Sequence, residues 1–72
     1  MKLTTLALEN ASLLRRIANG PLGAASQHAL AIGRDPSNVR KSVKALQAEG
    51  LVGPAAILVL TKAGEDMLAA LE

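Results

Sequence analysis

The sequence contains no cysteine and no phenylalanine, tyrosine or tryptophan. Without cysteine there is no disulfide framework and no thiolate ligand, and one histidine alone does not make a metal site. The hydrophobic 50% of the chain therefore consists of alanine, valine, isoleucine, leucine and methionine. A chain of 72 residues has room for one thin core of such side chains, so we expect residues 1–72 to form a single domain.

Long apolar runs are also absent. The longest uncharged apolar stretch, residues 51–61, is interrupted by Gly53 and Pro54 and is too short to span a bilayer. Residues 1–18 lack the unbroken apolar centre and the small-residue cleavage site of a secretory signal. We therefore expect a cytoplasmic protein with no membrane partner.

Groups that carry out catalysis are scarce. There is one histidine, no glycine-rich phosphate loop, and the carboxylates are scattered along the chain instead of paired. His28 falls among apolar residues, where a histidine usually packs against the core. We expect no catalytic site, no metal and no cofactor, and hence a protein that is not an enzyme.

The positive charge of the chain is concentrated in one segment. The net charge is only +2, but residues 34–44 hold four cations and one acid, a net charge of +3. The remaining residues hold four cations and five acids, a net charge of −1. A local excess of cations is typical of a nucleic-acid footprint. The four cations are Arg34, Arg40, Lys41 and Lys44.

Apolar periodicity and capping residues predict four helices, at residues 5–18, 26–32, 36–49 and 62–71. Asp35 is placed to cap the third of them, with proline at its first position. Thr61 is placed to cap the last one.

The segment between the third and fourth predicted helices has a different pattern. Residues 51–52 and 57–60 are apolar and partly β-branched, and a Gly53-Pro54 turn signal separates them. We expect a small β-hairpin here. The predicted fold class is therefore mainly α with one hairpin, in the order helix, helix, helix, hairpin, helix.

The predicted helix at 36–49 has one apolar and one basic face. On a wheel of about 100° per residue, Val39, Val43 and Leu46 form a narrow apolar stripe. Cations and small polar groups point away from this stripe, which suits the major groove of DNA. A solvated face of an ordinary amphipathic helix would show the same pattern. The outward set comprises Ser37, Arg40, Lys41 and Lys44.

Several short motifs occur in a recognisable order. They are Ala29, Ile32-Gly33, Asp35-Pro36-Ser37-Asn38-Val39, Val43, Leu46, Glu49-Gly50-Leu51-Val52 and Leu60-Thr61-Lys62-Ala63-Gly64. Their order and separation resemble winged helix-turn-helix transcriptional regulators, particularly the MarR-like group and similar small bacterial or phage repressors. The resemblance covers about two thirds of the chain.

This resemblance implies a sequence-specific regulator of transcription, by preference a repressor, that binds double-stranded DNA in the nucleoid. The helix at 36–49 would lie in the major groove, with Ser37, Asn38 and Lys41 in its first two turns as base readers. Ser26 and Gln27 would donate to phosphates. The full set of candidate DNA-binding residues is Ser26, Gln27, Arg34, Ser37, Asn38, Arg40, Lys41 and Lys44.

The chain departs from the family pattern in three places. His28 stands where an aliphatic residue is usual, and Arg34 replaces an apolar residue of the turn, adding a cation beside the reading helix. The expected wing tip, residues 53–56, is uncharged and short, so any contact it makes should be to phosphate through backbone amides.

Two expectations concern protein partners. Apolar residues in excess of a thin core predict a homodimer through the first and last helices; they are Leu3, Leu8, Met67, Leu68 and Leu71. The alternative function is a winged-helix protein adaptor that uses the apolar hairpin and the terminal helices, since a fold does not by itself fix a function.

Overall fold

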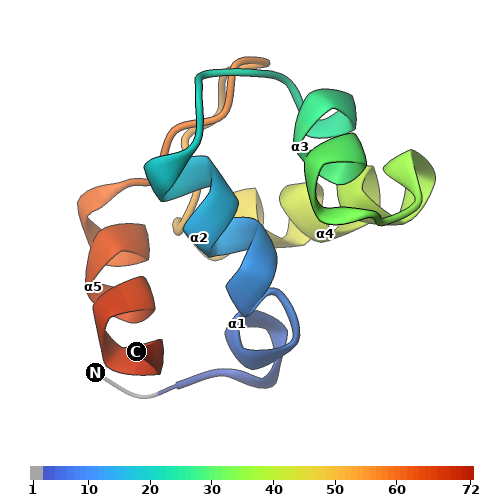
Figure 1. Cartoon of the computed structure of the whole chain (residues 1–72). Coiled ribbons are helices and arrows are strands. Elements are labelled where there is room, and N and C mark those ends of the chain that lie inside the picture. Colours follow the sequence, from blue (N-terminus) through green and yellow to red (C-terminus); the bar gives the residue numbers. More distant parts are fainter. Residues whose placement is uncertain (1–2) are drawn as a thin grey trace.

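Five helices and no strand make up residues 3–72, the part of the chain that the computed structural model describes (Figure 1). The helices are α1 (Thr5–Glu9), α2 (Ala11–Asn19), α3 (Ala25–Ile32), α4 (Pro36–Ala48) and α5 (Lys62–Leu71).

The first predicted helix, residues 5–18, is wrong as a single helix because the chain breaks at Asn10. Asn10 leaves helical geometry, with φ −112° and ψ 22°, and it is buried. Its Nδ2 group donates to the Leu6 carbonyl over 2.8 Å, and its Oδ1 accepts from Arg34 Nη1 over 2.8 Å. These bonds satisfy a buried amide that water cannot reach. Helices α1 and α2 therefore point in different directions (Figure 1).

Helices α3 and α4 are joined by a turn of three residues, 33–35, and both were predicted to within one residue at each end. Gly33 has φ 69°, the left-handed region that suits glycine at the end of a helix. Asp35 caps α4 as predicted, since its Oδ1 accepts from the Ser37 N–H over 3.0 Å. Pro36 occupies the first helical position, where no N–H is needed.

The predicted β-hairpin is wrong, and so is the winged fold class that depends on it. Between α4 and α5 the described chain forms one isolated antiparallel bridge, Val52 with Leu60, and no strand. Pro54 has no N–H with which to extend a ladder. The Leu58 N–H donates over 3.0 Å to the Gly23 carbonyl in the α2–α3 connection instead of to a facing strand. The segment is a loop that docks on another loop.

Helix α5 has the bounds that the sequence predicted, Lys62–Leu71. Its cap is Thr61, whose Oγ1 accepts from the Gly64 N–H over 3.0 Å and whose hydroxyl donates to the Gly50 carbonyl. Gly64 lies so close to Leu51 that a Cβ at this position would overlap the Leu51 carbonyl oxygen. The start of α5 is therefore fixed against the end of α4.

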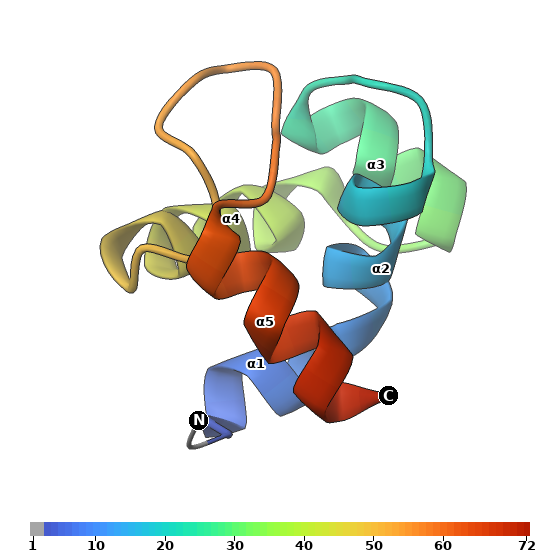
Figure 2. The same ribbon diagram turned by 90° about the vertical axis from the view of Figure 1, so that its left-hand side faces the viewer.

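One apolar core is enclosed by these elements. Helix α2 packs against α3 and α5, α4 packs against α1 and α3, and the loop between α4 and α5 lies beside the α2–α3 connection (Figures 1 and 2). The core residues are Ala7, Leu13, Leu14, Ile17, Ala29, Val39, Val43, Leu46, Leu51, Val52, Leu58, Leu60, Met67 and Leu68.

No helix in residues 3–72 is both long and apolar enough to cross a bilayer, since the longest of them, α4, has 13 residues.

Candidate nucleic-acid interface

Helix α4 is anchored by the apolar stripe that its sequence predicted. Val39, Val43 and Leu46 are all buried in the core. The capped N-terminus at Asp35 and the packing against α3 fix the helix at one end and along one side. The opposite face of α4 is thereby held toward solvent as a rigid surface.

Five candidate residues lie on this outward face of α4, and all five are exposed. None of their side chains forms a hydrogen bond or an ion pair with another residue of the described chain, 3–72. Their donors are therefore free to bind a ligand. We call this set the α4 face; it consists of Ser37, Asn38, Arg40, Lys41 and Lys44.

A groove of about 350 Å³ separates the α4 face from the loop that precedes α5. Arg40 and Lys44 line one wall, and the uncharged segment 54–56 lines the other. The loop is held in place by Gln47, whose Nε2 donates to the Gly53 carbonyl over 2.9 Å. Two cations thus border the groove, and its far wall carries no charge that would repel an anion.

The first turn of α3 borders the same groove through Ala25. Ser26, next in the chain, is exposed. Gln27 has a local partner, because its Oε1 accepts from the Ala24 N–H over 2.8 Å in the manner of a cap. Its Nε2 group remains a donor. The structure therefore places Ser26 next to a residue that borders the groove, whereas the Gln27 side chain is turned back to the start of α3.

Arg34, the remaining candidate, is directed elsewhere. It is half-buried, and its guanidinium donates to Asn10 Oδ1 over 2.8 Å and to Ser42 Oγ over 3.3 Å. It links the α1–α2 junction to the inner side of α4. These bonds tie the Arg34 side chain to the α1–α2 junction, apart from the α4 face.

His28 lies in the core, as its apolar setting predicted, with only 2% of its surface exposed. Burial lowers the pKa of His28, and the nearby positive charge of Arg16 lowers it further, while a hydrogen bond to the Gly23 carbonyl acts in the opposite direction. The fold therefore favours the neutral form of the ring over the charged form.

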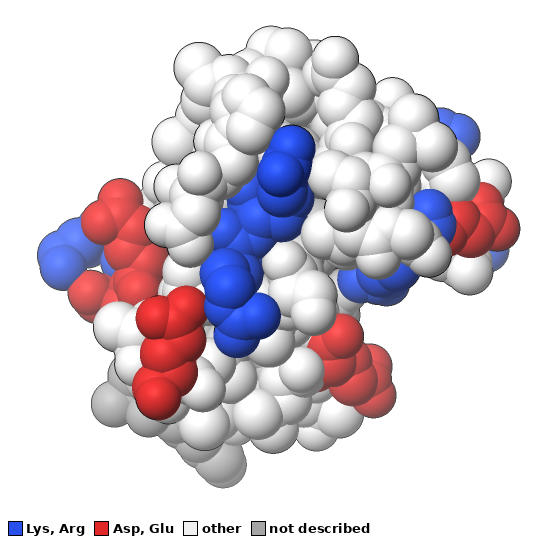
Figure 3. Space-filling model, viewed as in Figure 1, with Lys and Arg blue, Asp and Glu red and all other residues white. Residues whose placement is uncertain are grey.

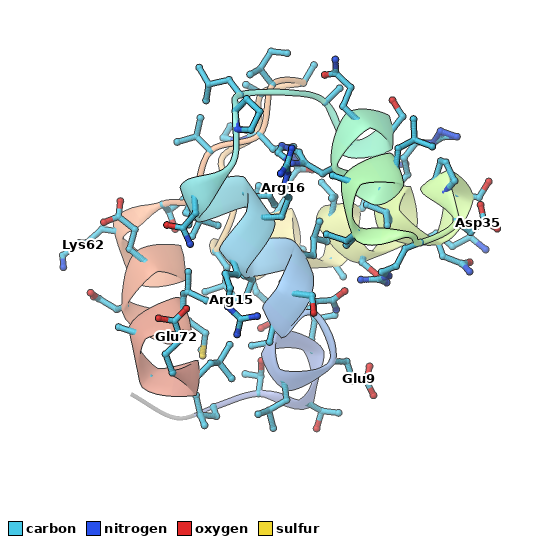
Figure 4. The ribbon with its side chains drawn as sticks, in the orientation of Figure 1. Glu9, Arg15, Arg16, Asp35, Lys62 and Glu72 are labelled. Atoms are coloured by element: carbon cyan, nitrogen blue, oxygen red, sulfur yellow. The ribbon has the colours of Figure 1, made fainter. Side chains whose placement is uncertain are left out.

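A second basic surface lies over α2, where the sequence predicted none. Figure 3 shows it as a column, and Figure 4, in the same orientation, labels Arg15 and Arg16 along it. Arg15 is paired with Glu72 over 3.3 Å, with both side chains about half exposed. The groove lined by Arg15 and Arg16 shares no residue with the groove beside the α4 face, so the two basic surfaces are separate.

The sequence did not predict the groove beside α4 or the role of Gln47, which holds the loop that forms the far wall of the groove. No sequence signal could have found them, because the groove depends on where the loop docks. Comparison with models of known families, with characterised proteins and with solved structures finds no match to this chain. The function of this chain is therefore inferred from its own residues and their geometry.

Proposed function

We propose that this protein binds double-stranded DNA through the α4 face. The observation that carries the proposal is that three cations and two small polar residues share one rigid, exposed helix face and have no bonding partner within residues 3–72. An arginine or lysine with no partner keeps its full charge available for phosphate. In helix-turn-helix proteins the second helix of such a unit is the reading helix, and α4 has that position in the α3–turn–α4 unit.

The geometry suggests a division of roles along α4. Ser37, Asn38 and Lys41 lie in the first two turns, where a helix that enters the major groove meets base edges. Arg40 and Lys44 flank the groove beside the loop, where a phosphate strand would lie. Ser26 and the backbone amides of the loop before α5 would add neutral hydrogen bonds to the same phosphate strand.

The small number of free cations limits the affinity of one domain. If Arg40, Lys41 and Lys44 each neutralise one phosphate, log K falls with log salt with a slope of about −2.7. Affinity for DNA would then drop about fortyfold between about 50 and 200 mM salt. A single domain should therefore bind weakly and in a strongly salt-dependent way.

Sequence selection would make such a protein a regulator of transcription in the nucleoid, and a repressor where its site overlaps a promoter. The resemblance noted above supports this role only through the α3–turn–α4 unit and the capped start of α5.

The test compares two charge-matched double variants by fluorescence anisotropy with a random duplex pool. Arg40→Ala/Lys44→Ala removes two cations from the α4 face, and Arg15→Ala/Lys62→Ala removes two from surface ion pairs elsewhere. The α4 variant should lose about two units of salt slope, and the control should keep its slope. Equal losses in both variants would show that only net charge matters and would contradict the proposal.

Contact with another protein is the second candidate function. The observation that favours it is a set of exposed apolar side chains outside the α4 face, on the two loops that dock on each other.

A further inference from the structure

An apolar patch stands where the α2–α3 connection meets the loop before α5. Leu22 is 73% exposed, Val59 is 53% exposed and Ile57 is 48% exposed. The hydrogen bond from the Leu58 N–H to the Gly23 carbonyl holds the two loops side by side (Figure 2). We call Leu22, Ile57 and Val59 the loop patch. Large apolar side chains gathered in this way usually mark an interaction site.

Two grooves of unlike charge meet at Gly20, at the end of α2, and one of them adjoins this patch. One, of about 390 Å³, is lined by Arg15 and Arg16. The other, of about 320 Å³, is lined by Leu22 and Val59 and has Glu65 at its edge. Cations therefore lie on one side of Gly20, and the apolar patch with an acid lies on the other.

The charges nearest the patch are not neutralised within the described chain. Arg15 is paired with Glu72, whereas Arg16 forms no ion pair with any of residues 3–72. Glu65 likewise has no ion pair there, because Lys62 bonds to Asp66 instead. One free cation and one free acid therefore remain on opposite sides of the end of α2.

We infer that the loop patch is the contact surface for a second copy of this chain. In a two-fold dimer the same surface is used twice, and a group on one side of the axis meets the group from the opposite side of the partner. Leu22 and Val59 would then pack against their own copies. Arg16 of each chain would face Glu65 of the other, so that two ion pairs border one apolar centre.

A stable contact between two copies would cover a large share of the exposed surface. A standard interface takes about 800 Å² from each partner. That is roughly a fifth of the 4190 Å² that the chain exposes.

The loop patch is a different surface from the one expected for a dimer through the first and last helices. Two of the apolar residues behind that prediction, Met67 and Leu68, lie in the core, and Leu71 is partly buried. Leu3 and Leu8 remain exposed at that end of the molecule. The loop patch brings together three exposed apolar side chains and lies near an unpaired cation and an unpaired acid.

The experiment is sedimentation of the full chain without DNA over a range of concentrations, so that its outcome is independent of DNA binding. The expected mass is that of a dimer at about 100 µM. Leu22→Lys should raise the dissociation constant at least about a hundredfold, because each dimer would lose two leucine contacts. The matched control is Leu30→Lys, since Leu30 is 76% exposed but lies on α3 outside the patch. It should leave the dimer intact.

Charge reversal tests the paired contacts directly. Arg16→Glu and Glu65→Arg should each weaken the dimer, and the double variant should restore it, because the two ion pairs then re-form with reversed sign. Restoration cannot result from damage to the fold. A monomer at all concentrations would overturn the inference, as would a dimer that Leu22→Lys leaves intact.

Discussion

The histidine in the core gives the protein a built-in dependence on pH. The pKa of His28 is lowered in the folded state, first by burial and then by the charge of Arg16. In the unfolded chain it returns to about 6.5, so below that pH the unfolded state binds more protons than the folded state. Stability is complete above the unfolded pKa and falls as the pH drops below it.

We predict that the free energy of unfolding decreases between pH 7.5 and 5.5, by at most about 1.4 kcal/mol per pH unit from this group. Urea unfolding of the wild type and of His28→Gln at both pH values measures it. The variant should have a lower stability at pH 7.5 but a flatter pH dependence. An equal pH dependence in the two proteins would show that His28 is not the titrating group.

Gly64 tests the contact between the start of α5 and the end of α4. An alanine in a helix interior normally gains about 1 kcal/mol over glycine. Here its Cβ would overlap the Leu51 carbonyl oxygen. Gly64→Ala should therefore lower the free energy of unfolding by about 1 to 3 kcal/mol. The neighbouring exposed change Ala63→Gly should cost no more than about 1 kcal/mol. A stabilised Gly64→Ala variant would mean that α5 does not pack here.

At the scale of elements, the sequence predicted three of the five helices almost to the residue. The reason is that the ends of these helices are set by neighbouring residues. Asp35 and Pro36 start α4, and Thr61 starts α5. Gly33 ends α3. The outward cations of α4 were predicted for a similar reason, because its apolar stripe fixes which face is buried.

The elements that the sequence did not predict depend on distant partners. The break at Asn10 is satisfied by Arg34, 24 residues along the chain. The hairpin fails because Leu58 bonds to Gly23 in another loop, and Pro54 cannot pair. Arg34 was expected beside the reading helix for its charge, but its contacts with Asn10 and Ser42 turn it inward. Nothing in the local sequence specifies such pairings.

At the scale of the whole molecule, the proposals use different surfaces. The α4 face carries cations beside one groove, and Leu22 and Val59 of the loop patch line a different groove. A dimer through the loop patch would leave both copies of the α4 face accessible. It would double the number of phosphate contacts and so compensate for the few cations on each domain.

The most direct test of DNA binding is an NMR titration of the isotope-labelled protein with a short mixed-sequence duplex at about 50 mM salt. If the α4 face binds DNA, the largest amide shifts fall in residues 36–44 and 53–58, with smaller shifts at Ser26 and Gln27. The amides of α5 should change least. Shifts centred on Arg15 and Arg16, or no shifts at all, would contradict the assignment of the α4 face as the DNA-binding surface.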